Sequence, residues 1–147
     1  MKTFLRIFLI VSLLSTFSTA VYSQKAEYDK LNKKLAALYK EGQYGDAIKV
    51  AEEAVQVAEK TFGKKHPYVS ASLNNLALLY IAQGEYSKAE TIYEQSLKIA
   101  EDILGKNHPQ LIGILENMAK CCDELGEYDK AETLEERAQS IRSTSNS

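Results

Sequence analysis

The chain has 147 residues, of which 18 are basic and 20 acidic, giving a net charge of −2. That length fits one small domain. A mildly acidic chain has no electrostatic footprint for nucleic acid or for an anionic membrane surface, so both kinds of partner are disfavoured.

Residues 1–23 differ in composition from the rest. Two basic residues precede an apolar run from Ile7 to Leu14, and small residues follow, an order typical of a secretory signal peptide. Cleavage after Ala20 or after Ser23 fits the pattern. The apolar run is well short of the roughly 20 residues that span a bilayer, so a membrane anchor is the weaker interpretation. We expect a secreted or periplasmic protein that has no membrane contact once the leader is removed.

Removal of this leader changes the charge balance. All 20 acidic residues remain, while two of the 18 basic residues are lost, so the net charge moves from −2 to −4. The mature domain is therefore still less suited to nucleic acid than the full chain.

The rest of the sequence repeats with a period of 42 residues. The positions that coincide are a glycine (Gly42, Gly84, Gly126), a tyrosine (Tyr44, Tyr86, Tyr128) and an alanine (Ala47, Ala89, Ala131). The linker Gly63-Lys-Lys-His-Pro67 likewise matches Gly105-Lys-Asn-His-Pro109. A fixed period, with the same residues recurring at the same place in each repeat, is typical of a stacked-repeat protein.

Apolar residues at helical spacing predict three pairs of helices. Their expected ranges are Asp29–Glu41, Tyr44–Phe62, Pro67–Gln83, Tyr86–Leu104, Pro109–Leu125 and Tyr128–Arg142. Gly63 is placed to take the left-handed turn that ends a helix. His66 precedes a proline suited to a first helical position, so we interpret it as a cap. The recurring alanine indicates a close helix crossing that admits no larger side chain.

One stretch carries a family resemblance. The pattern Leu73-x-x-Leu76-Ala77-x-x-Tyr80-x-x-x-Gly84-x-Tyr86-x-x-Ala89-x-x-x-Tyr93 resembles a tetratricopeptide repeat (TPR). The 42-residue spacing is similar to the longer repeats of kinesin light chains. The resemblance implies an all-α fold, an α-solenoid of three TPR helix-turn-helix pairs in a right-handed superhelical stack. The implied division is 28–65, 66–107 and 108–142 for the repeats, with a disordered tail at 143–147.

The outer copies depart from the repeat pattern at a few positions. Lys34 replaces an apolar residue in the first copy, and Glu135 and Gln139 replace Tyr93 and Leu97 in the last. Terminal faces of a stacked array meet water and turn polar. Our hypothesis is a complete short array, which predicts a cooperative melting transition. Three repeats are near the minimum for stability, so a homodimer is a real alternative.

The resemblance also implies a concave groove lined by the first helix of each pair. Asn75 and Asn117 are the favoured contacts, because a carboxamide both donates and accepts and can hold a peptide backbone. Groove asparagines contact peptide main chain in kinesin-light-chain-like repeats, which supports this choice, although a surface asparagine commonly faces only solvent. The predicted peptide-binding groove comprises Asn32, Asn74, Asn75, Leu78, Ile81, Asn117 and Lys120. Some repeats of this kind bind acidic C-termini through a clamp of paired lysine and arginine residues, and this sequence matches that pattern poorly.

Metal or catalytic chemistry is disfavoured. His66 and His108 lie one repeat apart without clustered ligands, so capping explains them better than metal binding. Cys121 and Cys122 are neighbours on one helix and point about 100° apart, so they cannot bridge each other. Cys122 occupies a core position, whereas an intermolecular disulfide through Cys121 is an open alternative. We expect no enzyme activity, no cofactor and no metal.

These observations favour an exported TPR scaffold that binds a protein or peptide segment in its concave groove. The alternative is a self-associating structural module, a homo-oligomer with no separate peptide ligand. The identity of the partner is not encoded in any recognisable motif.

Overall fold

The computed structural model describes residues 22–145, and in that range all regular structure is helical. The first helix is helical from residue 22 to residue 40. The other elements are α2 (Tyr44–Phe62), α3 (Pro67–Ala82), α4 (Tyr86–Leu104), the 3₁₀ turn η1 (Pro109–Leu111), α5 (Ile112–Leu125) and α6 (Tyr128–Ser145). The predicted leader, up to residue 21, lies outside the described residues.

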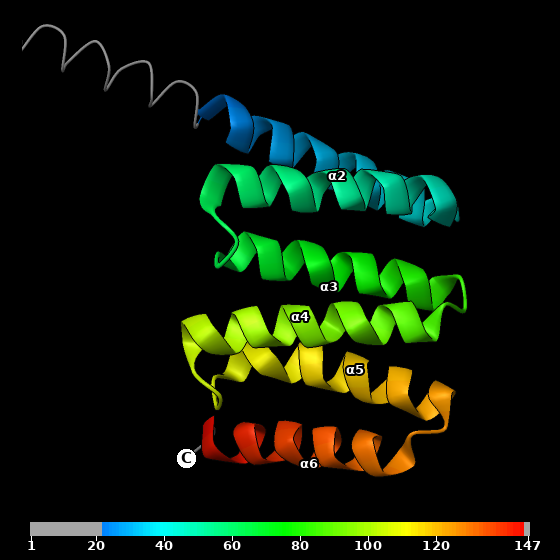
Figure 1. Ribbon diagram of the computed structural model, residues 1–147, viewed down its shortest axis with the longest axis vertical. Helices are drawn as coiled ribbons and strands as arrows, with labels where there is room; N and C mark the ends of the chain where they lie inside the picture. The colour runs from blue at the N-terminus through cyan, green and yellow to red at the C-terminus, as the bar shows by residue number, and fades with distance from the viewer. Residues whose placement is uncertain (1–21, 146–147) are drawn as a thin grey trace, which may run out of the picture.

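The six helices form three antiparallel pairs stacked one on the next, with the first helix at one end and α6 at the other (Figure 1). The predicted all-α solenoid is confirmed. Among the described residues, no helix combines the length and the apolar character needed to cross a bilayer.

Two hydrophobic clusters make up the core. One is formed by the first helix, α2 and α3, and the other by α3 to α6. Tyr80 and Ile92 pack against both clusters, so the core is continuous along the stack. Two buried serines also join α3 to α4: the Ser96 hydroxyl donates to the Ser70 carbonyl at 2.8 Å, and the Ser70 hydroxyl donates to the Ser96 carbonyl at 2.9 Å.

The crossings inside the pairs are close, as predicted. Ala47 and Ala89 have no exposed surface, and Ala131 is 2% exposed. Each alanine therefore lies where a longer side chain meets the partner helix directly.

The two long linkers combine a glycine stop with a histidine cap. Nδ1 of His66 accepts from the backbone N–H of Tyr68 at 3.2 Å, and Nδ1 of His108 accepts from that of Gln110 at the same distance. The predicted caps are confirmed. Gly63 has φ 90° and ψ 155°, which lies outside the left-handed helical region and in one that is essentially glycine-only. Gly63 thus ends the helix as predicted, but with a more extended backbone than the predicted left-handed turn.

The helix ends differ from the predictions in three places. The first helix begins at least seven residues earlier than expected, because Tyr28 is buried and its hydroxyl hydrogen-bonds with the Ser72 hydroxyl at 3.1 Å. The fifth helix opens with a 3₁₀ turn. Residues 143–145, expected in the disordered tail, continue α6, where the Thr144 and Ser145 hydroxyls donate to carbonyls of the preceding turn.

Candidate peptide-binding groove

A pocket lies between the first helix and α3, on the face predicted to be the groove. It has a volume of about 360 Å³ and brings together three predicted residues, Asn32, Asn75 and Leu78. The rest of its wall is Leu35, Ala36, Tyr39 and Leu79. The pocket is therefore apolar with two carboxamides at its surface.

The two carboxamides differ in how far they are already engaged. Nδ2 of Asn32 donates to the Tyr28 carbonyl at 2.9 Å, which leaves its side-chain oxygen as an acceptor. Asn75 is half-buried and makes no hydrogen bond to any residue in the described part of the chain. Its amide can both donate and accept, as backbone recognition requires.

Tyr39 is a further wall residue that was not singled out from the sequence. It is 50% exposed, and its ring contacts Tyr44 edge-on at 5.6 Å between centroids. The repeat places Tyr39 on the same helical face as Asn32, but the predicted apolar contacts, Leu78 and Ile81, both lie on α3.

Asn74 lies in a second pocket, on the other side of α3. This pocket has a volume of about 220 Å³ and lies between α3, α4 and the start of the third pair. Its wall is mainly apolar, and includes Ala71, Ile103, Leu104 and Ile114. Oδ1 of Asn74 is buried and has no hydrogen-bond partner among the described residues.

The other predicted groove residues are not gathered at either pocket. Ile81 is half-buried and packs against the larger hydrophobic cluster. Asn117 is also half-buried and lines neither of these two pockets. Lys120 lines a depression between α5 and α6, where Arg142 is hydrogen-bonded to Glu116 at 2.5 Å. The predicted set is therefore divided along the stack.

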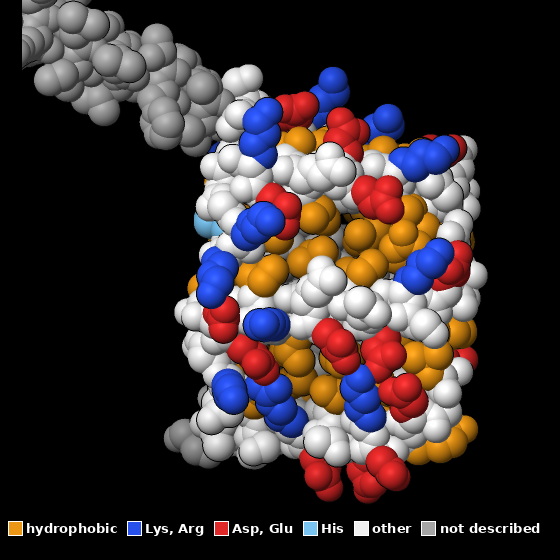
Figure 2. Space-filling view, viewed as in Figure 1, with side chains coloured by type: hydrophobic (Ala, Val, Ile, Leu, Met, Phe, Trp, Pro, Cys, Tyr) orange, Lys and Arg blue, Asp and Glu red, His pale blue; other side chains and the backbone are white. Residues whose placement is uncertain are grey.

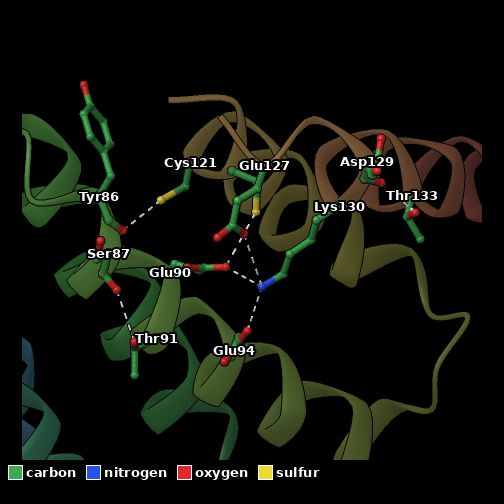
Figure 3. A network of polar contacts seen from close by, with 11 residues as sticks. Tyr86, Ser87, Glu90, Thr91, Glu94, Cys121, Glu127, Asp129, Lys130 and Thr133 are labelled. Carbon is green, nitrogen blue, oxygen red and sulfur yellow. Dashed lines mark hydrogen bonds and ion pairs between the residues drawn. The ribbon is translucent and has the colours of Figure 1, made fainter. Parts of the chain in front are cut away.

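A polar network lies away from the groove, where α4, α5 and α6 meet (Figure 3). The Lys130 ammonium contacts Glu90, lies 2.9 Å from Glu94 and 3.9 Å from Glu127. The hydrogen bond to Glu90, together with the one to Glu94, raises the pKa of Lys130 well above its ordinary value. This cation therefore ties α6 to α4.

The two cysteines border this network and are fully buried. Cys121 donates its thiol proton to the Tyr86 carbonyl at 3.1 Å (Figure 3). Burial raises the pKa of Cys121 to about 11 and also raises that of Cys122. The core assignment of Cys122 is confirmed, whereas a disulfide between molecules through Cys121 does not fit its burial. Protonated, enclosed thiols are poor nucleophiles.

The same region also holds a set of metal-ligating atoms. The ligand atoms of Glu90, Cys122 and Glu127 lie within 4.8 Å of one another. The Lys130 ammonium lies against both carboxylates and offsets part of their negative charge.

Comparison with known proteins agrees with this geometry. The sequence profile described as Tetratricopeptide repeat matches residues 29–102 and 68–144. No curated protein matches the chain significantly.

Three solved structures illustrate the similarity in fold. BtubC (BKLC) from P. vanneervenii is 23% identical, with a TM-score of 0.76 over 81% of this chain and 48% of that one. The TPR domain of Arabidopsis FLU is 19% identical, with a TM-score of 0.72 over 82% of this chain and 98% of that one. The putative kinesin light chain repeats of Podosopora anserina are 25% identical, with a TM-score of 0.71 over 80% of this chain and 56% of that one.

The chain thus spans about half the length of the first and third of these structures. The profile, by contrast, covers nearly all of the described residues, in two overlapping matches. This chain belongs to the tetratricopeptide repeat family.

Proposed function

We propose that this protein is an exported, non-catalytic scaffold that binds an extended protein segment in the groove between its first helix and α3. Tetratricopeptide repeats generally serve as scaffolds for protein–protein interaction. The observation that carries the finer proposal is the pocket where Asn32 and Asn75 border an apolar wall.

The chemistry of this pocket suits a peptide rather than a small polar ligand. The apolar wall accepts a hydrophobic side chain, while the free carboxamide of Asn75 can hold the main chain beside it. Because main-chain groups are the same at every residue, such contacts bind a segment without reading its full sequence. The pocket then selects which side chain enters.

Export is proposed from the N-terminal pattern of basic, apolar and small residues. Mass spectrometry of the protein purified from its producing cell measures the processed N-terminus directly. A chain that begins after Ala20 or Ser23 supports export, whereas an intact Met1 on the purified protein contradicts it.

Groove binding is tested with peptides selected from a random displayed library and measured by fluorescence anisotropy. We expect Asn75→Asp to weaken the selected peptides, because a carboxylate cannot donate, and Leu78→Asp to abolish binding through loss of the apolar wall. Gln95→Glu is the matched control, since it converts an exposed α4 amide outside both pockets. Full binding by the Leu78→Asp variant, with its fold intact by circular dichroism, would rule out this groove.

A further inference from the structure

The first helix presents lysines that lack partners. Lys30, Lys33, Lys34 and Lys40 are all exposed, and none forms an ion pair with a described residue. Lys34 lies near enough to Asp46 to add a small lowering of the pKa of that carboxyl, beyond the larger effect of Lys49. Glu27 and Glu41 are exposed in the same segment and form no ion pair with described residues, so residues 22–41 carry two more positive than negative charges. We call this the lysine end (Lys30, Lys33, Lys34, Lys40).

The opposite end has the reverse arrangement. All three cations of α6 are engaged by acidic residues of the stack, since Lys130 contacts Glu90, Arg137 lies 2.6 Å from Glu101 and Arg142 lies 2.5 Å from Glu116. The acidic side chains of α6 are exposed and form no ion pair with described residues. We call these the carboxylate end: Asp129, Glu132, Glu135 and Glu136.

This asymmetry is visible on the surface. Figure 2 shows acidic side chains projecting from the end formed by α6, and basic side chains together with some acidic ones at the end formed by the first helix. Lys120 is the one basic side chain lining the α5–α6 depression that has no ion-pair partner in the described part of the chain. The net difference in charge between the two ends therefore remains.

The two ends also match in shape. Inside the stack, the first helix of each pair seats against the preceding pair, and α6 has no such neighbour (Figure 1). A depression of about 290 Å³ between α5 and α6 marks this open position, and its lining includes Lys120 and the paired Glu116 and Arg142. Glu135 and Gln139 also line it, and they correspond to Tyr93 and Leu97 one repeat earlier, on α4. The lining is balanced in charge, so the attraction for a helix with basic side chains comes from the other exposed carboxylates of α6, Asp129, Glu132 and Glu136.

We propose that copies of this chain associate head to tail, with the lysine end of one copy seated on the carboxylate end of the next. The contact is heterologous, so it does not close on itself and each added copy leaves one free end of each kind. It is formed largely by exposed charges, which individually contribute little and are screened by salt. The association is therefore weak and strongly dependent on ionic strength, and it leaves the groove free.

Sedimentation velocity of the protein purified from its producing cell, with the N-terminus that mass spectrometry identifies, tests the proposal. We expect the weight-average mass to rise with concentration beyond that of a dimer at about 20 mM salt and to return to the monomer value near 1 M salt. A monomer at every concentration in low salt overturns the proposal, and so does a mass that stops at two copies.

Neutralising variants separate the two ends. The lysine-end variant is Lys30→Gln, Lys33→Gln, Lys40→Gln, and the carboxylate-end variant is Glu132→Gln, Glu135→Gln, Glu136→Gln. Each alone should weaken association at least about tenfold. Mixed together, they retain one intact lysine end and one intact carboxylate end, so the mixture should form one-to-one pairs and nothing larger.

The matched control removes three exposed lysines, one each from α2, the α2–α3 linker and α4. Lys60→Gln, Lys64→Gln, Lys98→Gln changes the net charge by the same amount at positions that form no ion pair in the described structure. Association must persist in this variant. Equal loss in the control and the lysine-end variant would mean that net charge, not the end contact, governs the mass, and would overturn the proposal.

Discussion

A single methyl group sets the distance between paired helices in this protein. Ala89 has no exposed surface and lies on α4, where that helix meets α3. In such a position each added carbon has to displace a neighbour, because protein interiors are close-packed.

Ala89→Leu should therefore destabilise the fold by about 1–3 kcal/mol through overpacking. Urea unfolding followed by circular dichroism measures the change. Ala37→Leu is the control, because Ala37 is exposed on the first helix and the same substitution there should change stability by less than about 0.5 kcal/mol. Equal stability of the two variants would contradict the close crossing.

The buried thiols should resist modification in the folded protein. Because the pKa of Cys121 is about 11, only about one thiol in a thousand is ionised at pH 8. We expect disulfide-exchange reagents to label neither cysteine rapidly without urea and both within seconds in unfolding concentrations of urea. Fast labelling of the native protein, counted by mass spectrometry, would show that α4 and α5 open readily.

The same thiol makes stability depend on pH in a defined direction. Burial raises the pKa of Cys121 in the folded state, so the folded protein holds that proton more tightly than the unfolded chain. Its stabilising contribution is complete below the ordinary thiol pKa and is lost as the pH rises through about 11. The urea midpoint should fall between pH 8 and pH 11, and fall less in Cys121→Ala.

Neighbouring residues show what periodicity alone can predict about the site. The period aligns Asn32 with Asn74, whereas the structure brings Asn32 into one pocket with Asn75 and Leu78. Asn74 precedes Asn75 in the chain but lines a different pocket, because consecutive residues on a helix point about 100° apart. Which neighbouring helix each one meets depends on stacking, which is not visible within one repeat.

At the level of elements, each helix pair is separated from the next by a glycine and a histidine cap. His66 and His108 hold equivalent amide protons, but their surroundings differ. The His66 ring also stacks on Phe62 at 4.8 Å, whereas no aromatic contact of this kind is found for His108 within residues 22–145.

Loss of either cap should cost stability, and the two losses should be unequal. His108→Ala should destabilise by about 1 kcal/mol, the usual effect of removing a cap acceptor, and His66→Ala by more, because it also removes the ring contact. His108→Asn should restore most of the stability, since asparagine is a good cap. Thermal unfolding of the three variants measures the order of their stabilities. A His66→Ala variant as stable as the unsubstituted protein would contradict the predicted order.

The start of the first helix was the least predictable boundary. The segment before Asp29 has no apolar period of its own, and its helical state depends on Tyr28, whose ring lies 5.1 Å from that of Tyr68. That contact joins residues far apart in sequence. The helix interiors, by contrast, follow from local spacing, and α2 and α4 match their predicted bounds.

On the scale of the whole molecule, cooperative folding depends on the junction between the two core clusters. Ser70 and Ser96 are buried there and satisfy each other's hydroxyls and carbonyls. Removal of one hydroxyl leaves the partner's hydrogen bonds incomplete in an enclosed site.

Ser96→Ala should therefore destabilise by about 1–3 kcal/mol, while Ser70→Ala together with Ser96→Ala should cost less than the sum of the single changes. A double-mutant cycle from urea unfolding measures the coupling. Additive losses would show that the pair does not act as a unit, and a broadened transition would show that the two clusters unfold separately.

The overall architecture was the most predictable feature, because the same residues recur at a fixed interval and each copy has to solve the same packing problem. The charges at the two ends of the stack were harder to predict from the sequence. The sequence shows as many as three cations on α6, and only their pairing with α4 and α5 reveals that its outer face is acidic.

The position of α3 between two pockets sets a length scale for any bound segment. The pockets flank a helix whose diameter with side chains is about 10–12 Å. An extended chain advances about 3.3–3.6 Å per residue, so two side chains that filled both pockets would stand at least about three residues apart. Under the proposed function, the protein would therefore select the interval between a partner's side chains as well as their chemistry.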